Sequence, residues 1–170
     1  MPKPILFLVS LALACLSACS DYSLSVNERT VYQPSQIFSD YRLDDPALRA
    51  CVQQALVDQG ATRASDLKDL NCNDAGIRTL AGLDVFDGLE RLSLNNNLIS
   101  EITPLYNIPS LRLLQLTNNR LQTVSSQFCT IGLKTISLFG NAGLDCRRLP
   151  ALSDCGITLA AVPAHCESSP

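Results

Sequence analysis

Residues that could do chemistry are sparse in this 170-residue chain, and they do not form a recognisable set. The one histidine, His165, precedes a cysteine near the C-terminus, and no nucleophile motif stands near it. A serine or cysteine hydrolase needs a positioned base and usually an orienting acid. We therefore expect His165 to be a solvent-exposed tail residue and the protein to have no enzymatic activity.

Metal, phosphate and nucleic-acid sites find equally little support. Asp44, Asp45 and Asp74 lack the D-x-D-x-D-G spacing of a calcium loop, and no cysteines have the C-x-x-C spacing typical of zinc. No G-x-x-x-x-G-K phosphate loop is present. The formal net charge is −3 without a basic run, which disfavours nucleic acid because Lys and Arg contacts to phosphate dominate that affinity. We predict no cofactor, no metal and no nucleic-acid partner.

The cysteine with the most specific chemical context is Cys19. Lys3 precedes an apolar run from Ile5 to Leu16, which is too short to span a bilayer at about 20 residues and is typical of a secretory signal. The following Leu16-Ser17-Ala18-Cys19 resembles the lipobox of bacterial lipoproteins. That resemblance implies cleavage before Cys19 and its modification by a diacylglyceryl thioether and an amide-linked acyl chain. The alternative is an ordinary signal that is cut elsewhere.

The lipobox resemblance also implies a location. Ser20 follows the cysteine where an aspartate often signals retention in the inner membrane. We therefore expect a lipid anchor in the bacterial outer membrane, on the periplasmic side or at the cell surface. Removing residues 1–18 takes away Lys3 and changes the net charge from −3 to −4.

Six cysteines remain once Cys15 leaves with the signal and Cys19 carries lipid. An even number in an exported chain indicates three disulfides, and spacing alone leaves the connectivity open. The six are Cys51, Cys72, Cys129, Cys146, Cys155 and Cys166.

A 22-residue period organises the middle of the chain, where Leu67, Leu89, Leu111 and Leu133 follow one another at that interval. Two complete copies read L-x-x-L-x-L-x-x-N-x-L/I-x-x-I/V, and this pattern resembles the leucine-rich repeat, whose copies span about 20–29 residues. The two copies are Leu89, Leu92, Leu94, Asn97, Ile99 and Ile102, then Leu111, Leu114, Leu116, Asn119, Leu121 and Val124.

The spacing has a direct physical meaning. In L-x-L, alternation places both leucines on one face of a short strand, and one strand cannot bury them alone. Stacked copies form a parallel sheet and a continuous core. Asn97, Asn119 and Asn141 fall where each chain leaves its strand, so we expect a ladder of side-chain amides that pairs buried turn groups.

The flanking segments are expected to close the two ends. Asp45-Pro46 begins an amphipathic helix that ends at Gly60. Cap helix and repeats together resemble the internalin-like proteins of bacteria over residues 37–146. The resemblance implies an α/β solenoid: a right-handed superhelix with a parallel sheet on its concave face, an N-terminal helical cap and a disulfide-bonded C-terminal cap.

These elements position the cysteines. Cys51 lies on the apolar face of the cap helix, and Cys72 occupies a core position of the first strand, so the two should meet. Cys146 and Cys166 bracket the segment after the last repeat and are expected to join. Cys129 and Cys155 then remain for each other.

The expected organisation has five parts. They are a signal peptide (1–18), a flexible tether (19–36), an N-terminal helical cap (37–66), four leucine-rich repeats (67–146) and a C-terminal cap with its tail (147–170).

The positive functional prediction is a binding surface on the strands. Solenoids present their sheet as an extended recognition face, and here that face is mostly small and polar. Leu113 and Phe139 are apolar where water is expected, and Arg91 stands beside them with Gln115 and Asn95. We interpret these five as contacts to a protein partner, since exposed apolar and Arg side chains are frequent interface anchors. The alternative is a structural envelope component without a specific partner pocket.

Overall fold

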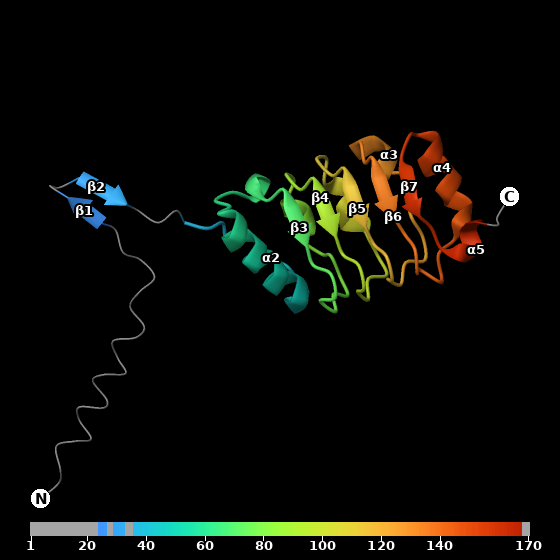
Figure 1. The fold of residues 1–170 in the computed structure, drawn as a ribbon, viewed down its shortest axis with the longest axis horizontal. Coiled ribbons are helices and arrows are strands. Elements are labelled where there is room, and N and C mark those ends of the chain that lie inside the picture. Colours follow the sequence, from blue (N-terminus) through green and yellow to red (C-terminus); the bar gives the residue numbers. More distant parts are fainter. Residues whose placement is uncertain (1–23, 27–28, 33–35, 168–170) are drawn as a thin grey trace, which may run out of the picture. The chain divides into compact units, whose positions relative to one another are not determined.

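A computed structural model describes residues 24–26, 29–32 and 36–167 (Figure 1). The chain divides into two units, Met1–Gln36 and Ile37–Pro170, which are considered separately. The predicted signal peptide and lipobox cysteine lie outside the described residues. Within the described part, no helix combines the length and apolar character needed to cross a membrane.

The first unit contains two short strands, β1 (Leu24–Val26) and β2 (Arg29–Tyr32), which pair antiparallel. The sequence predicts a tether without regular structure here, and the two strands depart from that expectation. The two strands are rich in residues with high β-propensity. The segment as a whole is polar, so these short runs did not indicate strands. A two-stranded sheet is only marginally stable by itself.

The second unit is built on a five-stranded parallel sheet in the order β3-β4-β5-β6-β7. Equivalent positions of β3 to β6 pair directly, so the 22-residue period of the sequence becomes the register of the sheet. The strands are β3 (Asp69–Asn71), β4 (Arg91–Ser93), β5 (Leu113–Gln115), β6 (Thr135–Ser137) and β7 (Thr158–Ala161).

Strand β7 extends the sheet beyond the four predicted repeats. The sequence predicts a C-terminal cap in this segment, because Gly143 and Cys146 break the repeat pattern. β7 pairs with β6 with a register shift between Ile136 and Ser137, and Leu138 N donates to Ala161 O at 2.7 Å. Unpaired groups at the edge of β6 thereby gain partners from a strand outside the four 22-residue repeats.

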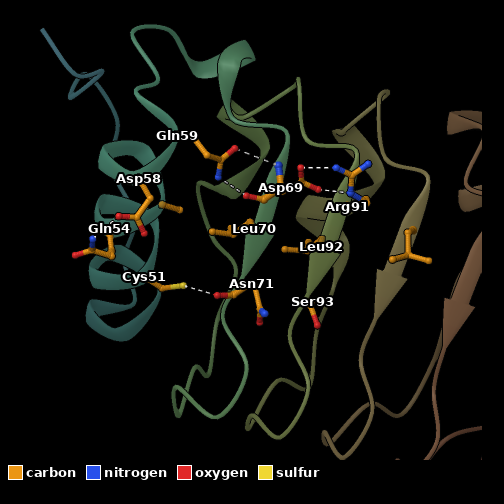
Figure 2. Close-up of a pocket in the computed structure, with 12 residues that line it drawn as sticks. Cys51, Gln54, Asp58, Gln59, Asp69, Leu70, Asn71, Arg91, Leu92 and Ser93 are labelled. Atoms are coloured by element: carbon orange, nitrogen blue, oxygen red, sulfur yellow. Dashed lines mark hydrogen bonds and ion pairs between the residues drawn. The ribbon is translucent and has the colours of Figure 1, made fainter. Parts of the chain in front are cut away.

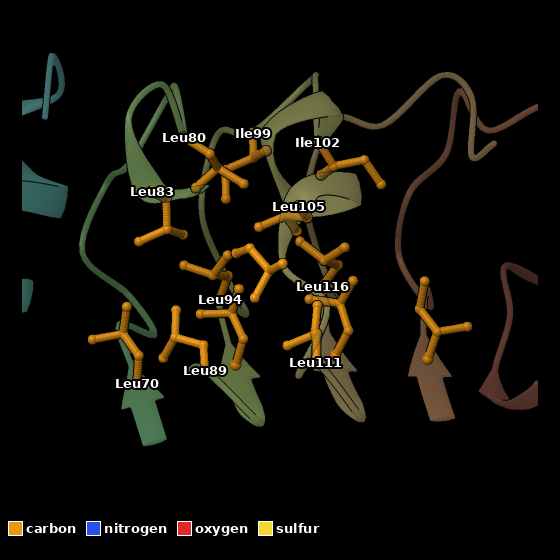
Figure 3. Close-up of a cluster of buried hydrophobic side chains, with 14 of the residues drawn as sticks. Leu70, Leu80, Leu83, Leu89, Leu94, Ile99, Ile102, Leu105, Leu111 and Leu116 are labelled. Carbon is orange, nitrogen blue, oxygen red and sulfur yellow. The ribbon is translucent and has the colours of Figure 1, made fainter. Parts of the chain in front are cut away.

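The core lies between this sheet and a layer of short helical turns (Figure 3). Alternation sends Leu70, Leu92, Leu114 and Ile136 inward, and each is at most 2% exposed. The turns that alternate with the strands are η1 (Ala64–Asp66), η2 (Leu83–Val85), η3 (Thr103–Asn107) and α3 (Phe128–Ile131). The short helices that follow β6 are η4 (Cys146–Arg148), α4 (Leu149–Asp154) and α5 (Ala164–Glu167).

The predicted asparagine ladder is present at the exits of the strands. Asn119 Nδ2 donates to Leu94 O at 2.9 Å and to Leu116 O at 3.2 Å, while its Oδ1 accepts from Ile99 N at 3.1 Å. Asn97 and Asn141 make equivalent bonds. Each amide thus ties its own turn to the preceding repeat. The first repeat has no preceding repeat, which explains why Ala75 suffices there.

Helix α2 (Pro46–Gln59) lies beside β3 at the start of the sheet (Figure 1). Asp45 is its N-cap, with Oδ1 accepting from Ala47 N at 2.9 Å, and Gly60 ends it in the left-handed conformation. The buried face consists of Leu48, Val52 and Leu56, all part of the common core.

Asp45 also fastens the helix start to the first repeat, because its Oδ2 accepts from Arg78 N at 2.8 Å and from Thr79 N at 3.3 Å. Burial by itself raises the pKa of Asp45, but the backbone N–H donors, led by that of Arg78, outweigh it and lower the pKa. The carboxylate therefore stabilises the fold above its unfolded pKa of about 3.9, and this contribution disappears as pH falls through the lower folded pKa.

We predict that Asp45→Asn lowers the free energy of unfolding by about 1 kcal/mol at pH 7, since the amide keeps an acceptor but loses the charge. The difference from wild type should shrink towards pH 2. Urea unfolding at both pH values measures this, with the exposed Asp84→Asn as control. An equal difference at both pH values would contradict the assigned role.

Three disulfides link the cysteines in the pairs expected from the sequence. They are Cys51–Cys72, Cys129–Cys155 and Cys146–Cys166, with Cα–Cα distances of 5.9, 5.8 and 5.2 Å. The first joins α2 to the residue that follows β3. The second joins α3 to the end of α4, and the third joins η4 to α5.

Candidate binding face

Three rows of side chains cover the outward side of the sheet, and together they are called the sheet face. Along each strand, alternate residues point away from the core, and the register aligns equivalent positions across strands. The first row is Asp69, Arg91, Leu113 and Thr135. The second row is Asn71, Ser93, Gln115 and Ser137, and the third is Asn73, Asn95, Thr117 and Phe139.

The first row contains an ion pair between neighbouring strands. The Arg91 guanidinium binds both carboxylate oxygens of Asp69, and this hydrogen bonding and charge raise the pKa of Arg91. Leu113 lies on β5, beside Arg91 on the neighbouring strand β4, and it is partly buried. The structure therefore brings Arg91 and Leu113 together, but it also gives Arg91 an internal partner that the sequence did not reveal.

The second and third rows are joined by side-chain hydrogen bonds. Ser93 Oγ lies 2.8 Å from Gln115 Oε1 and 2.9 Å from Asn73 Oδ1. Asn95 Nδ2 donates to Gln115 Oε1 at 3.3 Å, and Asn95 Oδ1 accepts from Thr117 N at 2.9 Å. Two of the predicted contacts, Asn95 and Gln115, are thus neighbours in an ordered polar network.

Phe139 is set apart from the other predicted contacts. Its exposed fraction is 51%, and it lies in the third row, whereas Leu113 lies in the first row. The third row follows the ends of the strands, four residue positions after the first row, which corresponds to about 13 Å of extended chain. The two apolar residues therefore belong to opposite edges of the sheet face and do not form one patch.

A groove of about 500 Å³ lies between α2 and the first three strands, and it is called the α2 groove (Figure 2). Cys51, Ala55 and Leu113 contribute apolar wall, while Gln54, Asp58, Arg91 and Ser93 contribute polar groups. Gln59 fixes the helix to the strand at one end, because its Nε2 donates to Asp69 O at 2.6 Å.

A solved structure of internalin C2 from Listeria monocytogenes strain 4b F2365 is similar to this chain, with a TM-score of 0.56. The match covers 70% of this chain and 56% of that one, at 24% sequence identity. The fold is that of a leucine-rich repeat solenoid. At this identity the likeness concerns the fold alone, and the chain spans little more than half of that structure's length. No protein-family model and no curated protein matches the sequence.

Sequence reasoning missed Gln54, Asp58 and Gln59 as part of the candidate site. The helical pattern predicts that all three are polar positions of the cap helix. It does not show which of them line a groove next to the strands. That depends on how α2 is rotated and fastened against the first repeat of the solenoid, which Cys51 and Gln59 fix through long-range contacts.

His165 is exposed, as expected, but it is not a free tail residue. Its ring Nε2 lies 3.0 Å from Leu144 O, and its ring nitrogen and the sulfurs of Cys146 and Cys166 lie within 4.8 Å of one another. Metal ligation by cysteine needs thiolates, and here the two sulfurs are bonded to each other. The cluster therefore fastens the C-terminal end of the solenoid.

Proposed function

We propose that the protein is a non-enzymatic, lipid-anchored leucine-rich repeat protein of the bacterial outer membrane that binds a protein partner through its sheet face. The observation that carries this proposal is the sheet face itself: three aligned rows on neighbouring strands, with Leu113 half-buried in one row and Phe139 exposed in another. Apolar side chains within an ordered polar surface are typical anchors of protein interfaces.

A structural role in the envelope is the second candidate, and one observation favours it. Ser93, Asn95 and Gln115 satisfy one another through hydrogen bonds, so fewer of their polar atoms are available to a partner. In that case the fold and the lipid anchor are sufficient for function, and the composition of the sheet face is unimportant.

We predict that Arg91→Ala/Leu113→Ala/Phe139→Ala releases the partner from the soluble 20–170 fragment in a pull-down read by mass spectrometry. The triple variant truncates the arginine and the two apolar side chains of the first and third rows, and it leaves the core leucines intact. The matched control is Val85→Ala, which truncates an apolar residue that is 40% exposed on η2, away from the sheet face. Partner retention by a folded triple variant would favour the structural role.

For the anchor, we predict that Cys19→Ser moves the protein from the membrane fraction to the soluble fraction or blocks its processing, because serine provides no thiol for the thioether. Fractionation followed by intact-mass measurement tests this, with Ser17→Ala as a control that keeps the cysteine. Unchanged partitioning and processing would exclude a lipid on Cys19.

A further inference from the structure

The α2 groove has an excess of negative charge. Of its three charged side chains, Asp69 and Arg91 neutralise each other. The third, Asp58, accepts a hydrogen bond from Gln54 Nε2 at 2.7 Å, and within residues 36–167 no Lys or Arg forms an ion pair with it. One carboxylate at the groove therefore lacks a cation.

We propose that the α2 groove receives a lysine or arginine side chain of the protein partner; this rests on the proposed function and specifies the chemistry recognised there. Long cationic side chains lay their aliphatic stems on apolar surface and keep the charged head at a polar edge. Cys51 and Ala55 offer such a surface on α2, and Asp58 lies on the same helix at the edge of the groove (Figure 2).

The remaining polar groups explain why charge, and not hydrogen bonding, determines the choice of occupant. Ser93 is engaged with Gln115 and Asn73, the Gln59 amide is engaged with the backbone of β3, and Asn71 Oδ1 accepts from Asn73 N at 3.3 Å. Among residues 36–167, the Asp58 carboxylate forms a hydrogen bond only with Gln54, so it is the group with most capacity to attract a cation. An acidic side chain in the groove would meet like charge, and an aliphatic one would leave the carboxylate uncompensated.

The experiment titrates isotope-labelled soluble 20–170 fragment with three capped tripeptides, Gly-X-Gly, where X is lysine, arginine or norleucine. Backbone amide shifts are followed by NMR at low ionic strength. Lysine and arginine peptides should shift the amides of Ala55 and Asp58 saturably, with affinity about threefold to fivefold above that of the norleucine peptide, the range of a solvent-accessible ion pair. Added salt should reduce that difference.

Asp58→Asn should bring the affinity of the lysine peptide down to that of the norleucine peptide, because the amide keeps the size and the Gln54 contact but loses the charge. The control Asp84→Asn removes an exposed carboxylate of η2, outside the groove, and should leave the titration unchanged. Equal affinity for lysine and norleucine peptides, or a titration unaffected by Asp58→Asn, would overturn the inference.

The titration needs no natural partner, and the triple variant leaves Ala55 and Asp58 of the groove unchanged, so the two proposals fail separately. A negative titration combined with partner loss in the triple variant removes the groove inference alone. A positive titration combined with partner retention in that variant removes the sheet-face proposal alone.

Discussion

Loss of the Cys51–Cys72 disulfide in the variant Cys51→Ala/Cys72→Ala is expected to lower the free energy of unfolding by about 3 kcal/mol. The bond closes a loop with a sequence separation of 21, and on the chain-entropy model a loop of this size stabilises the fold by about that amount. This is a large share of the stability of a domain of this size, about 5–15 kcal/mol. Urea unfolding under oxidising conditions measures it.

The urea dependence gives an independent readout. Without the cross-link the unfolded chain is more expanded, so the m-value should rise as the midpoint falls. Val57→Ala is the control on the same helix, since Val57 is 60% exposed and its truncation should change stability by less than about 0.5 kcal/mol. An unchanged midpoint in the double variant, or free thiols at both positions in the oxidised protein, would show that the bond does not hold α2 to the first repeat.

The second large effect is expected at Asn119, which is 7% exposed. Asn119→Ala leaves Ile99 N and the carbonyls of Leu94 and Leu116 without this partner in a buried turn. An unsatisfied buried group costs about 1–3 kcal/mol, so we expect a loss of about 3 kcal/mol. Thermal and urea unfolding of the soluble fragment measure the loss.

Arg120→Ala is the matched control, because Arg120 is the exposed neighbour of Asn119 and only its backbone takes part in the hydrogen bonds of this turn. Its stability should stay within about 0.5 kcal/mol of wild type. A melting temperature of Asn119→Ala equal to that of Arg120→Ala would remove the structural role of the ladder.

The repeated part of the fold was predictable because one spacing serves several physical needs at once. The same 22-residue interval that brings Leu92 beside Leu114 also brings Asn97 beside Asn119. A second sequence pattern has the same period and predicts a backbone conformation. Asp74, Asn96, Asn118 and Gly140 follow at the same interval, and all have positive φ, at 57, 58, 55 and 75°. Asn, Asp and Gly are the residues that adopt this conformation most readily.

The ends of the solenoid were less predictable, because tertiary contacts decide them. β7 forms since it can pair with the edge of β6, and its Leu159 lies opposite Ile136 but follows it by 23 residues, outside the 22-residue period. Asp45 was expected to begin a helix, but its second oxygen binds Arg78 N and Thr79 N, more than thirty residues away in sequence. The ion pair of Arg91 with Asp69 likewise depends on the register of two strands.

Site-specific photo-crosslinking in cells tests most directly whether the sheet face binds a protein. A benzophenone amino acid is placed at Gln115 or Phe139 on the sheet face, or at Val85 on η2 as the control. We predict that both sheet-face positions yield the same discrete covalent adduct and that Val85 yields none. Adducts equally strong from Val85, or none from either sheet-face position in correctly localised protein, would contradict it.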